Sequence, residues 1–166
     1  MIRMKMNRKM QGMLDSCPNE NRNIIFSQKK LEELFSPKFV VIYDCILVTE
    51  DPQNFISEKD FNNFVKEEYT DKTGCEGSVS KTLINHYIDD TNLTAGDILP
   101  IAITVMKVWG SLLKNIDSES NFCMFVSCDV EFDFVTIRFH KIREDEPLWL
   151  DGDLEEVQEP VGYMIV

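Results

Sequence analysis

NFCMFVSCDV at residues 121–130 and FVTIRFHKI at residues 134–142 decide the fold of this chain. Both stretches are rich in β-branched and aromatic residues, and a turn at 131–133 separates them, so they predict two paired strands. VGYMIV at 161–166 predicts a final strand that closes the sheet. Alternation divides the side chains of the second strand between two faces: Val135, Ile137 and Phe139 on one, and Thr136, Arg138 and His140 on the other.

Upstream of these strands the pattern is helical, and the longest apolar run covers residues 98–116. We predict a helix over about 97–116 that is apolar on nearly all sides and is therefore central to the fold. Pro100 fits the first turn of such a helix, where a missing N–H costs little. Lys107 and Lys114 make a membrane span unfavourable, so the helix is expected in a protein core.

Three shorter segments, 27–35, 56–69 and 78–90, also predict helices. In the first, Ser27 is a candidate cap and Pro37 a stop signal. Residues 39–48 (FVVIYDCILV) favour one buried strand over a buried helix, although so short a run fits both.

The helix over 56–69 has the strongest start signal. Ser57 and Asp60 have the spacing of a capping box. Ile56 and Phe61 occupy the two positions of a hydrophobic staple. TGCEG at 73–77 predicts a glycine-marked turn before the next helix. Helices followed by mostly antiparallel strands predict an α+β fold, with N-terminal and central helices packed on a C-terminal sheet.

A length of 166 residues fits a single domain, which we place at 1–166, and an apolar share of 43% is enough for a core. The five cysteines form no CxxC pair and leave an odd thiol. We therefore expect them to be reduced in a cytoplasmic protein.

The net charge of −12 is unevenly distributed along the chain. Residues 1–30 carry +5, and residues 31–166 carry −17. The acidic part repels nucleic acid and anionic membranes and attracts basic proteins. The start, MIRMKMNRKMQGM, lacks the apolar core of a signal peptide, so 1–30 is predicted as a basic helix or mobile arm.

REDEPLWLDGDLEEVQEP at 143–160 concentrates that negative charge, with eight carboxylates and one base among eighteen residues. Trp149 stands among them, and tryptophan is a common anchor in protein interfaces. Two readings stay open: a solvated loop with Trp149 capping the sheet, or a surface that meets a basic partner. For the second reading, the candidate partner-binding residues are Glu144, Asp145, Glu146, Trp149, Asp151, Asp153, Glu155 and Glu156.

Motifs for catalysis or metal binding are missing from the sequence. His86 and His140 are the two histidines, and no HExxH, CxxC or phosphate-loop pattern accompanies them. DGDLEE at 151–156 lacks the later glycine and glutamate of a calcium loop. We predict no catalytic residues, no metal and no cofactor. A small enzyme using Cys75, His86 and His140 remains the least favoured hypothesis.

The segments VTIRFHKIREDEPLWLDGDLEE (135–156) and TGCEGSVSKTLINHYIDD (73–90) resemble immunity proteins of bacterial contact-dependent growth inhibition systems. The similarity is to the type that neutralises a ribonuclease toxin domain delivered from a neighbouring cell, and it covers about residues 35–166. A strand ending in RFHKIR, then WL, then DLEE carries it.

The resemblance implies a cytoplasmic, non-catalytic protein that binds the C-terminal nuclease domain of a cognate toxin, and it assigns no residue-level contacts. An acidic inhibitor would cover the basic cleft that such a toxin uses to hold RNA. Neither nucleic acid nor membrane is an expected partner, and the oligomeric state stays open. The alternative from the residues alone is an acidic adaptor module for another basic protein.

Overall fold

Strands β5 (Phe122–Asp129) and β6 (Phe134–Lys141) lie in the middle of a five-stranded sheet. The computed structural model of the chain describes residues 4–17, 24–49, 57–90 and 92–166. The strand order is β1–β7–β5–β6–β4, and all four pairings are antiparallel. The remaining strands are β1 (Met4–Met6), β4 (Thr82–Leu83) and β7 (Val161–Ile165). The predicted hairpin and final strand are therefore confirmed, but β7 lies between β1 and β5 and does not close the sheet, because β1 forms that edge.

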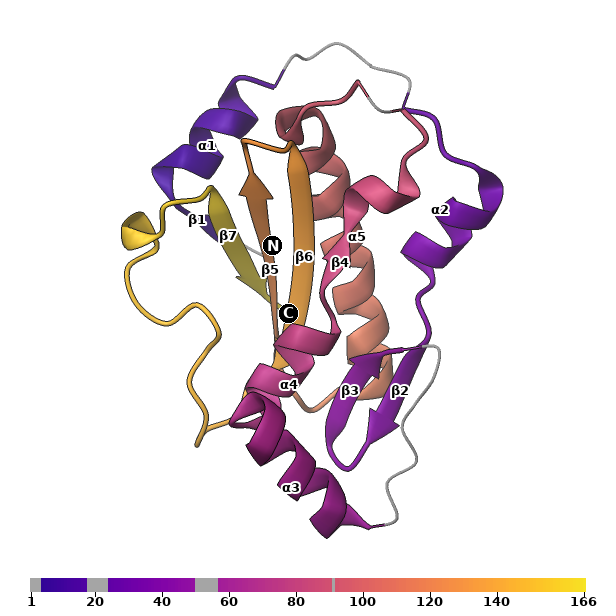
Figure 1. Cartoon of the computed structure of the whole chain (residues 1–166), viewed down its shortest axis with the longest axis vertical. Coiled ribbons are helices and arrows are strands. Elements are labelled where there is room, and N and C mark those ends of the chain that lie inside the picture. The colour runs from indigo at the N-terminus through magenta and orange to yellow at the C-terminus, as the bar shows by residue number, and fades with distance from the viewer. Residues whose placement is uncertain (1–3, 18–23, 50–56, 91) are drawn as a thin grey trace.

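Helix α5 (Ala95–Ile116) covers the apolar face of the sheet and forms the main core with it (Figure 1). Helices α1 (Arg8–Asp15) and α2 (Gln28–Phe35) pack against α5 from its other sides. The side chain of Trp109 on α5 is buried, and its Nε1 donates to the Leu34 carbonyl at 2.7 Å, which fixes α2 to α5. This arrangement confirms the predicted α+β fold with helices packed on a mostly antiparallel sheet.

Two further helices lie at one end of the molecule, beside the hairpin of β2 (Phe39–Ile42) and β3 (Cys45–Val48) (Figure 1). They are α3 (Glu58–Tyr69) and α4 (Lys72–Val79). Ser57 caps α3 as predicted, because its side chain accepts from the Asp60 N–H, whereas Ile56 lies outside the described residues. A second small core of buried side chains joins these elements: Cys45, Leu47, Phe61, Val65 and Cys75.

The start of α5 differs from the prediction by two residues, and this changes the position of its proline. Thr94 and Asp97 form a capping box, so the helix begins at Ala95 and Pro100 lies in its second turn. A helical residue at position 100 would donate its N–H to the Gly96 carbonyl. The Cys17 thiol occupies that acceptor instead, with Sγ 3.3 Å from the Gly96 oxygen.

The prediction of one buried strand over 39–48 is wrong, because the chain reverses at Tyr43 and Asp44. Both residues have positive φ, 41° and 70°, as a two-residue hairpin turn requires. Val40 pairs with Leu47 across the resulting hairpin. The signal was weak in the sequence, since neither turn residue is the glycine or asparagine that usually marks such a reversal.

The predicted turn at 73–77 and the predicted helix at 78–90 are both wrong. Residues 72–79 form α4, whose start is capped by Asp71. The helix stops at Ser80, whose buried hydroxyl bonds both backbone groups of Phe139 on β6. The following residues pair with β6 as β4 and then form the 3₁₀-helix η1 (Ile84–Tyr87). Contacts with distant strands thus override the local helical pattern.

Residues 4–15, predicted as a basic helix or arm, contribute both a helix and an edge strand. β1 pairs with β7, with Lys5 opposite Tyr163. Asn7 then caps α1 with a buried side chain.

By length and composition α5 is the one helix among the described residues that could cross a membrane, but in this fold half of its apolar stretch is buried against the sheet and helices.

Candidate functional site

The acidic segment, residues 143–160, connects β6 to β7 across the face of the sheet opposite α5. In Figure 1 it leaves the sheet beside α4 and returns to β7 through the short 3₁₀-helix η2 (Leu154–Glu156). It has little regular structure of its own, so its position depends on the contacts that its side chains make with α4, β6 and α1.

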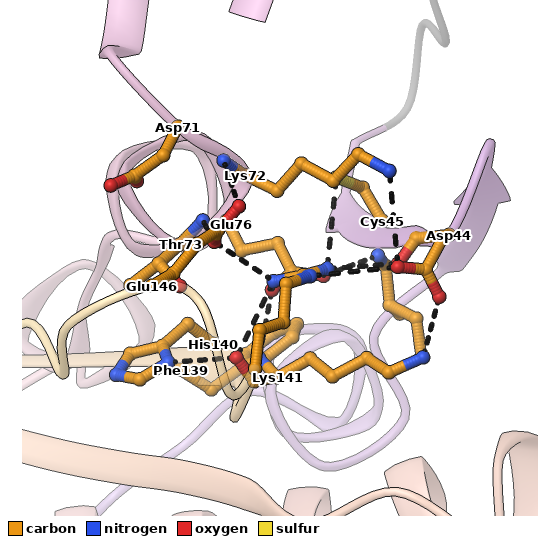
Figure 2. A network of polar contacts seen from close by, with 12 residues as sticks. Asp44, Cys45, Asp71, Lys72, Thr73, Glu76, Phe139, His140, Lys141 and Glu146 are labelled. Atoms are coloured by element: carbon orange, nitrogen blue, oxygen red, sulfur yellow. Dashed lines mark hydrogen bonds and ion pairs between the residues drawn. The ribbon is translucent and has the colours of Figure 1, made fainter. Parts of the chain in front are cut away.

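Arg143 fixes the start of the acidic segment by turning inward. Its guanidinium donates through Nη1 to Oε2 of Glu76 at 2.9 Å and through Nη2 to Oε1 at 3.1 Å. The Glu76 carboxylate is fully buried on α4 and also accepts from the backbone N–H groups of Ile46 and Lys141 (Figure 2). Burial by itself lowers the pKa of Arg143, but the hydrogen bonds and charge of Glu76 raise it above its usual value, so the pair is ionic.

A ring of further charges surrounds this pair at the edge of the β2–β3 hairpin (Figure 2). Asp44 lies 2.6 Å from the Lys141 ammonium and 3.9 Å from that of Lys72. Burial raises the pKa of Asp44, but the hydrogen bond and charge of Lys141 outweigh it and leave the pKa lowered. Hydrogen bonds from Ser120 and Lys141 lower the pKa of Asp117 to about 2. This network joins the hairpin, α4 and β6.

Glu146 caps the N-terminus of helix α4 and does not project from the surface. Its two carboxylate oxygens accept from the backbone N–H groups of Lys72 at 3.2 Å and Thr73 at 2.7 Å, in the first turn of α4. Negative charge at a helix N-terminus is favourable because unpaired N–H groups converge there. Glu146 also lies 3.7 Å from Arg143, and its side chain is only 15% exposed. It is therefore not available to a partner in this conformation.

Trp149 packs flat on the outer face of the sheet. Its ring stacks on Phe125 at a centroid distance of 5.9 Å and lies 5.4 Å from the Arg138 guanidinium. Its six-membered ring also lies directly against Gly77 of α4. The residue remains 37% exposed. The indole thus caps the sheet, which is one of the two interpretations that the sequence left open, and one edge of the ring remains in solvent.

His140 fixes the backbone of that tryptophan. The histidine is fully buried, with its Nδ1 3.0 Å from the Lys141 carbonyl and its Nε2 3.2 Å from the Trp149 backbone nitrogen. Because Nε2 must accept from an N–H and Nδ1 must donate to a carbonyl, both contacts are satisfied by the neutral Nδ1–H tautomer. Burial lowers the pKa of His140, which favours the same neutral form.

The far end of the acidic segment is attached to the N-terminal elements. Buried Asn7 donates to the Leu154 and Glu159 carbonyls, at 3.3 and 2.8 Å. Glu155 accepts from the Arg8 backbone at 2.9 Å and lies 3.4 Å from its guanidinium. The Asp153 side chain caps η2. The segment is therefore fixed at both ends and in its middle.

The remaining carboxylates of the predicted site point outward. Their side chains are exposed and make no hydrogen bond or ion pair with the parts of the chain that the structure describes: Glu144, Asp145, Asp151 and Glu156. An isolated exposed carboxylate is ordinary, but these four lie on one anchored segment. Together they present negative charge that no Lys or Arg side chain of the described residues pairs with.

The model of the Uncharacterized protein PM0498 family matches residues 5–165 of the chain. The chain belongs to this family. The match extends from β1 to the last residue of β7, so the sheet, the helices and the whole acidic segment lie within the family region. No curated protein matches the chain, and no solved structure does.

In this member of the family, the three side chains considered for catalysis are not assembled into a site. Cys75 is buried in α4, His140 is buried beneath Trp149, and His86 is exposed on η1. No hydrogen bond among the described residues joins any two of them. Over the described ranges, no group of three or more His, Cys, Asp or Glu side chains is placed to hold a metal ion.

Two features of this structure were not predicted from the sequence. The first is the Glu76–Arg143 pair: the sequence predicts a turn at 73–77, and a turn gives no reason to expect Glu76 to face a core. The second feature is the exposure of three apolar side chains, Val130, Phe132 and Phe134, at the predicted turn between β5 and β6. The alternation EFDF of aromatic and acidic residues at 131–134 was the available signal.

Proposed function

We propose that this protein is an immunity protein that binds and neutralises a cognate nuclease toxin domain in the cytoplasm. The sequence resemblance favours a ribonuclease as the toxin. The proposed partner is therefore a basic protein, and the proposed mode of action is non-catalytic: the acidic surface occupies or covers the cleft in which the toxin holds its nucleic acid.

The observation that carries this proposal is the anchored acidic segment with four outward carboxylates. Arg143, Trp149 and Asn7 hold the segment on the fold, so its charges keep a fixed arrangement. A fixed arrangement loses less conformational entropy on binding than a mobile loop would. The charge itself speeds encounter with a basic partner, which matters for a toxin that must be bound before it cleaves.

Trp149 has a different part in this proposal from the one predicted. Its contacts with Phe125, Arg138 and Gly77 hold the middle of the acidic segment on the sheet. Only its exposed edge is free for a partner. Likewise Glu146 and Arg143 position the segment, while the outward carboxylates supply the charge that a toxin domain would meet.

An RNA-protection assay tests the function. The C-terminal nuclease domain of the proposed cognate toxin would be purified and incubated with cellular RNA, alone or with an equimolar amount of this protein. Stoichiometric protection is expected. Absence of both protection and a complex would contradict the proposal and would favour an acidic adaptor for another basic protein.

A further inference from the structure

The turn between β5 and β6 carries a second candidate surface, separate from the four outward carboxylates of the acidic segment. Three apolar side chains stand in solvent there: Val130 is 63% exposed, Phe132 61% and Phe134 43%. The two phenylalanine rings stack on each other, with centroids 6.0 Å apart and planes inclined by 27°. Apolar side chains grouped in this way on a surface mark interaction sites more often than single exposed ones do.

Hydrogen bonds hold this turn firmly, so the exposure is not that of a frayed loop. Oδ1 of Asp129 accepts from the backbone N–H groups of Glu131 and Phe132, at 3.0 and 3.2 Å. The Asp133 side chain accepts from the Ala95 N–H at the start of α5, at 2.9 Å. A rigid turn presents its side chains to a partner at little entropic cost.

Asn85 of η1 attaches the turn from the other side. Its Nδ2 donates to the Asp133 carbonyl at 2.8 Å, and its Oδ1 accepts from the Val135 N–H at 2.9 Å. Asp133 itself has a φ of 55°, a left-handed conformation that aspartate tolerates better than most residues. The turn is therefore fixed to both α5 and η1.

In Figure 1 the turn between β5 and β6 lies at the end of the molecule where α1 and the start of α5 also lie. Hollows flank this turn. One, of about 300 Å³, lies between Phe132, Phe134 and the η1 region at Asn85 and Ile88. Another, of about 810 Å³, lies between Val130, α1 and residues 158–160. The exposed side chains thus project between concave surfaces that can receive side chains of a partner.

The charges around this turn select the kind of partner. Five carboxylates line the flanking hollows besides that of Asp97: Asp90, Asp129, Glu131, Asp133 and Glu159. Among the described residues that line these hollows, Lys9 is the one basic side chain, and its ammonium donates to the Gln158 carbonyl. An apolar centre with an acidic rim is complementary to a basic protein surface that carries an apolar recess.

We propose that Val130, Phe132 and Phe134 form the apolar anchor with which this protein docks on its basic nuclease partner. This inference rests on the proposed function and deepens it by naming the residues that provide affinity. In this arrangement the outward carboxylates of the acidic segment speed the encounter. The aromatic turn then slows dissociation, because desolvated aromatic anchors dominate the energetics of most interfaces.

Binding kinetics with the C-terminal nuclease domain of the proposed toxin would test the anchor. The double variant Phe132→Ser/Phe134→Ser removes two exposed rings, so its melting midpoint should stay close to that of the unmodified protein. Its complex should dissociate at least about tenfold faster, with a smaller change in association rate. Phe132→Leu/Phe134→Leu keeps apolar side chains and should restore most of the residence time.

Val41→Ser/Ile116→Ser is the matched control, since both side chains are exposed apolar residues on other elements. It should leave both rate constants unchanged. If the unmodified protein binds and protects RNA but the phenylalanine double variant does so equally well, the anchor is overturned and the proposed function stands. Equal weakening in the control pair would also overturn it. Failure of the unmodified protein to bind would overturn the proposed function itself.

Discussion

Trp149 lies so close to Gly77 that the helix has no room for a side chain there. A Cβ placed on Gly77 would come within 2.4 Å of Cε3 of the indole. Gly77 is in the interior of α4, where glycine is otherwise unfavourable. The glycine is therefore explained by the close approach of the acidic segment, and the two residues together fix that segment to the helix.

Gly77→Ala should destabilise the protein by about 1–3 kcal/mol, because the tryptophan must move away from its contact with Phe125. Gly12→Ala in α1 is the matched control, since nothing lies within 4 Å of its added Cβ. That control should stabilise the protein by up to about 1 kcal/mol through helix propensity. Urea unfolding of both variants measures the difference, and a stable Gly77→Ala protein would contradict the packing described.

Glu76→Ala should cost about 3–5 kcal/mol of unfolding free energy, because it leaves the buried Arg143 guanidinium without its carboxylate. Two backbone N–H groups, those of Ile46 and Lys141, also lose their acceptor. Glu33→Ala is the control from an exposed ion pair with Lys29, and it should cost at most about 0.5 kcal/mol. Comparable losses in the two variants would argue against a structural role for the buried pair.

Local sequence signals were sufficient for some elements of this fold and not for others. The pairing of β5 with β6 and the Ser57 cap of α3 follow from the local sequence and were predicted correctly. Helix α4 was not, because Glu146 and Trp149, some seventy residues away, complete its N-terminus and pack on its glycine. Its local sequence resembles a turn.

The same reason limited the prediction of the candidate site. Composition located the acidic segment, but it did not separate inward carboxylates from outward ones. Glu146 turns inward only because α4 begins where it does. Glu155 is paired only because the fold brings Arg8, 147 residues earlier in the chain, beside it. Asp151 and Glu156 have the same side-chain chemistry, but their carboxylates make no hydrogen bond or ion pair with the described residues. Tertiary contacts decide which of these carboxylates stabilise the fold, and the local sequence pattern does not reveal those contacts.

His140 predicts a pH dependence of stability. Burial lowers its pKa in the folded state, so between that value and about 6.5 the unfolded chain binds more protons than the folded one. Stability should therefore fall as the pH drops from 7 to 5. The lowered pKa values of Asp44 and Asp117 act at lower pH, because unfolded aspartates titrate near 3.8.

Unfolding free energies at pH 7 and pH 5 would check this dependence. In His140→Gln the decrease between the two pH values should be smaller than in the unmodified protein. His86→Gln, which changes the exposed second histidine, should retain the full decrease. An unchanged slope in His140→Gln would show that another group causes the loss of stability.

Charge reversal on the acidic segment should weaken toxin binding without weakening the fold. Asp151→Lys/Glu156→Lys changes two exposed carboxylates that make no hydrogen bond or ion pair with the described residues, so the melting midpoint should barely move. Affinity should fall more than about tenfold, equivalent to about 1.4 kcal/mol. Glu67→Lys/Glu68→Lys on α3 makes the same change in net charge at exposed positions elsewhere and is the control. It should leave affinity within a few-fold, whereas an equal loss would mean that overall charge matters and not this surface.

The salt dependence of binding also distinguishes an effect of this surface from an effect of overall charge. The association rate of the unmodified protein should fall from low salt to physiological salt, where the screening length is about 8 Å. The Asp151/Glu156 variant should show a weaker salt dependence, because it has lost the charges that attract the basic partner.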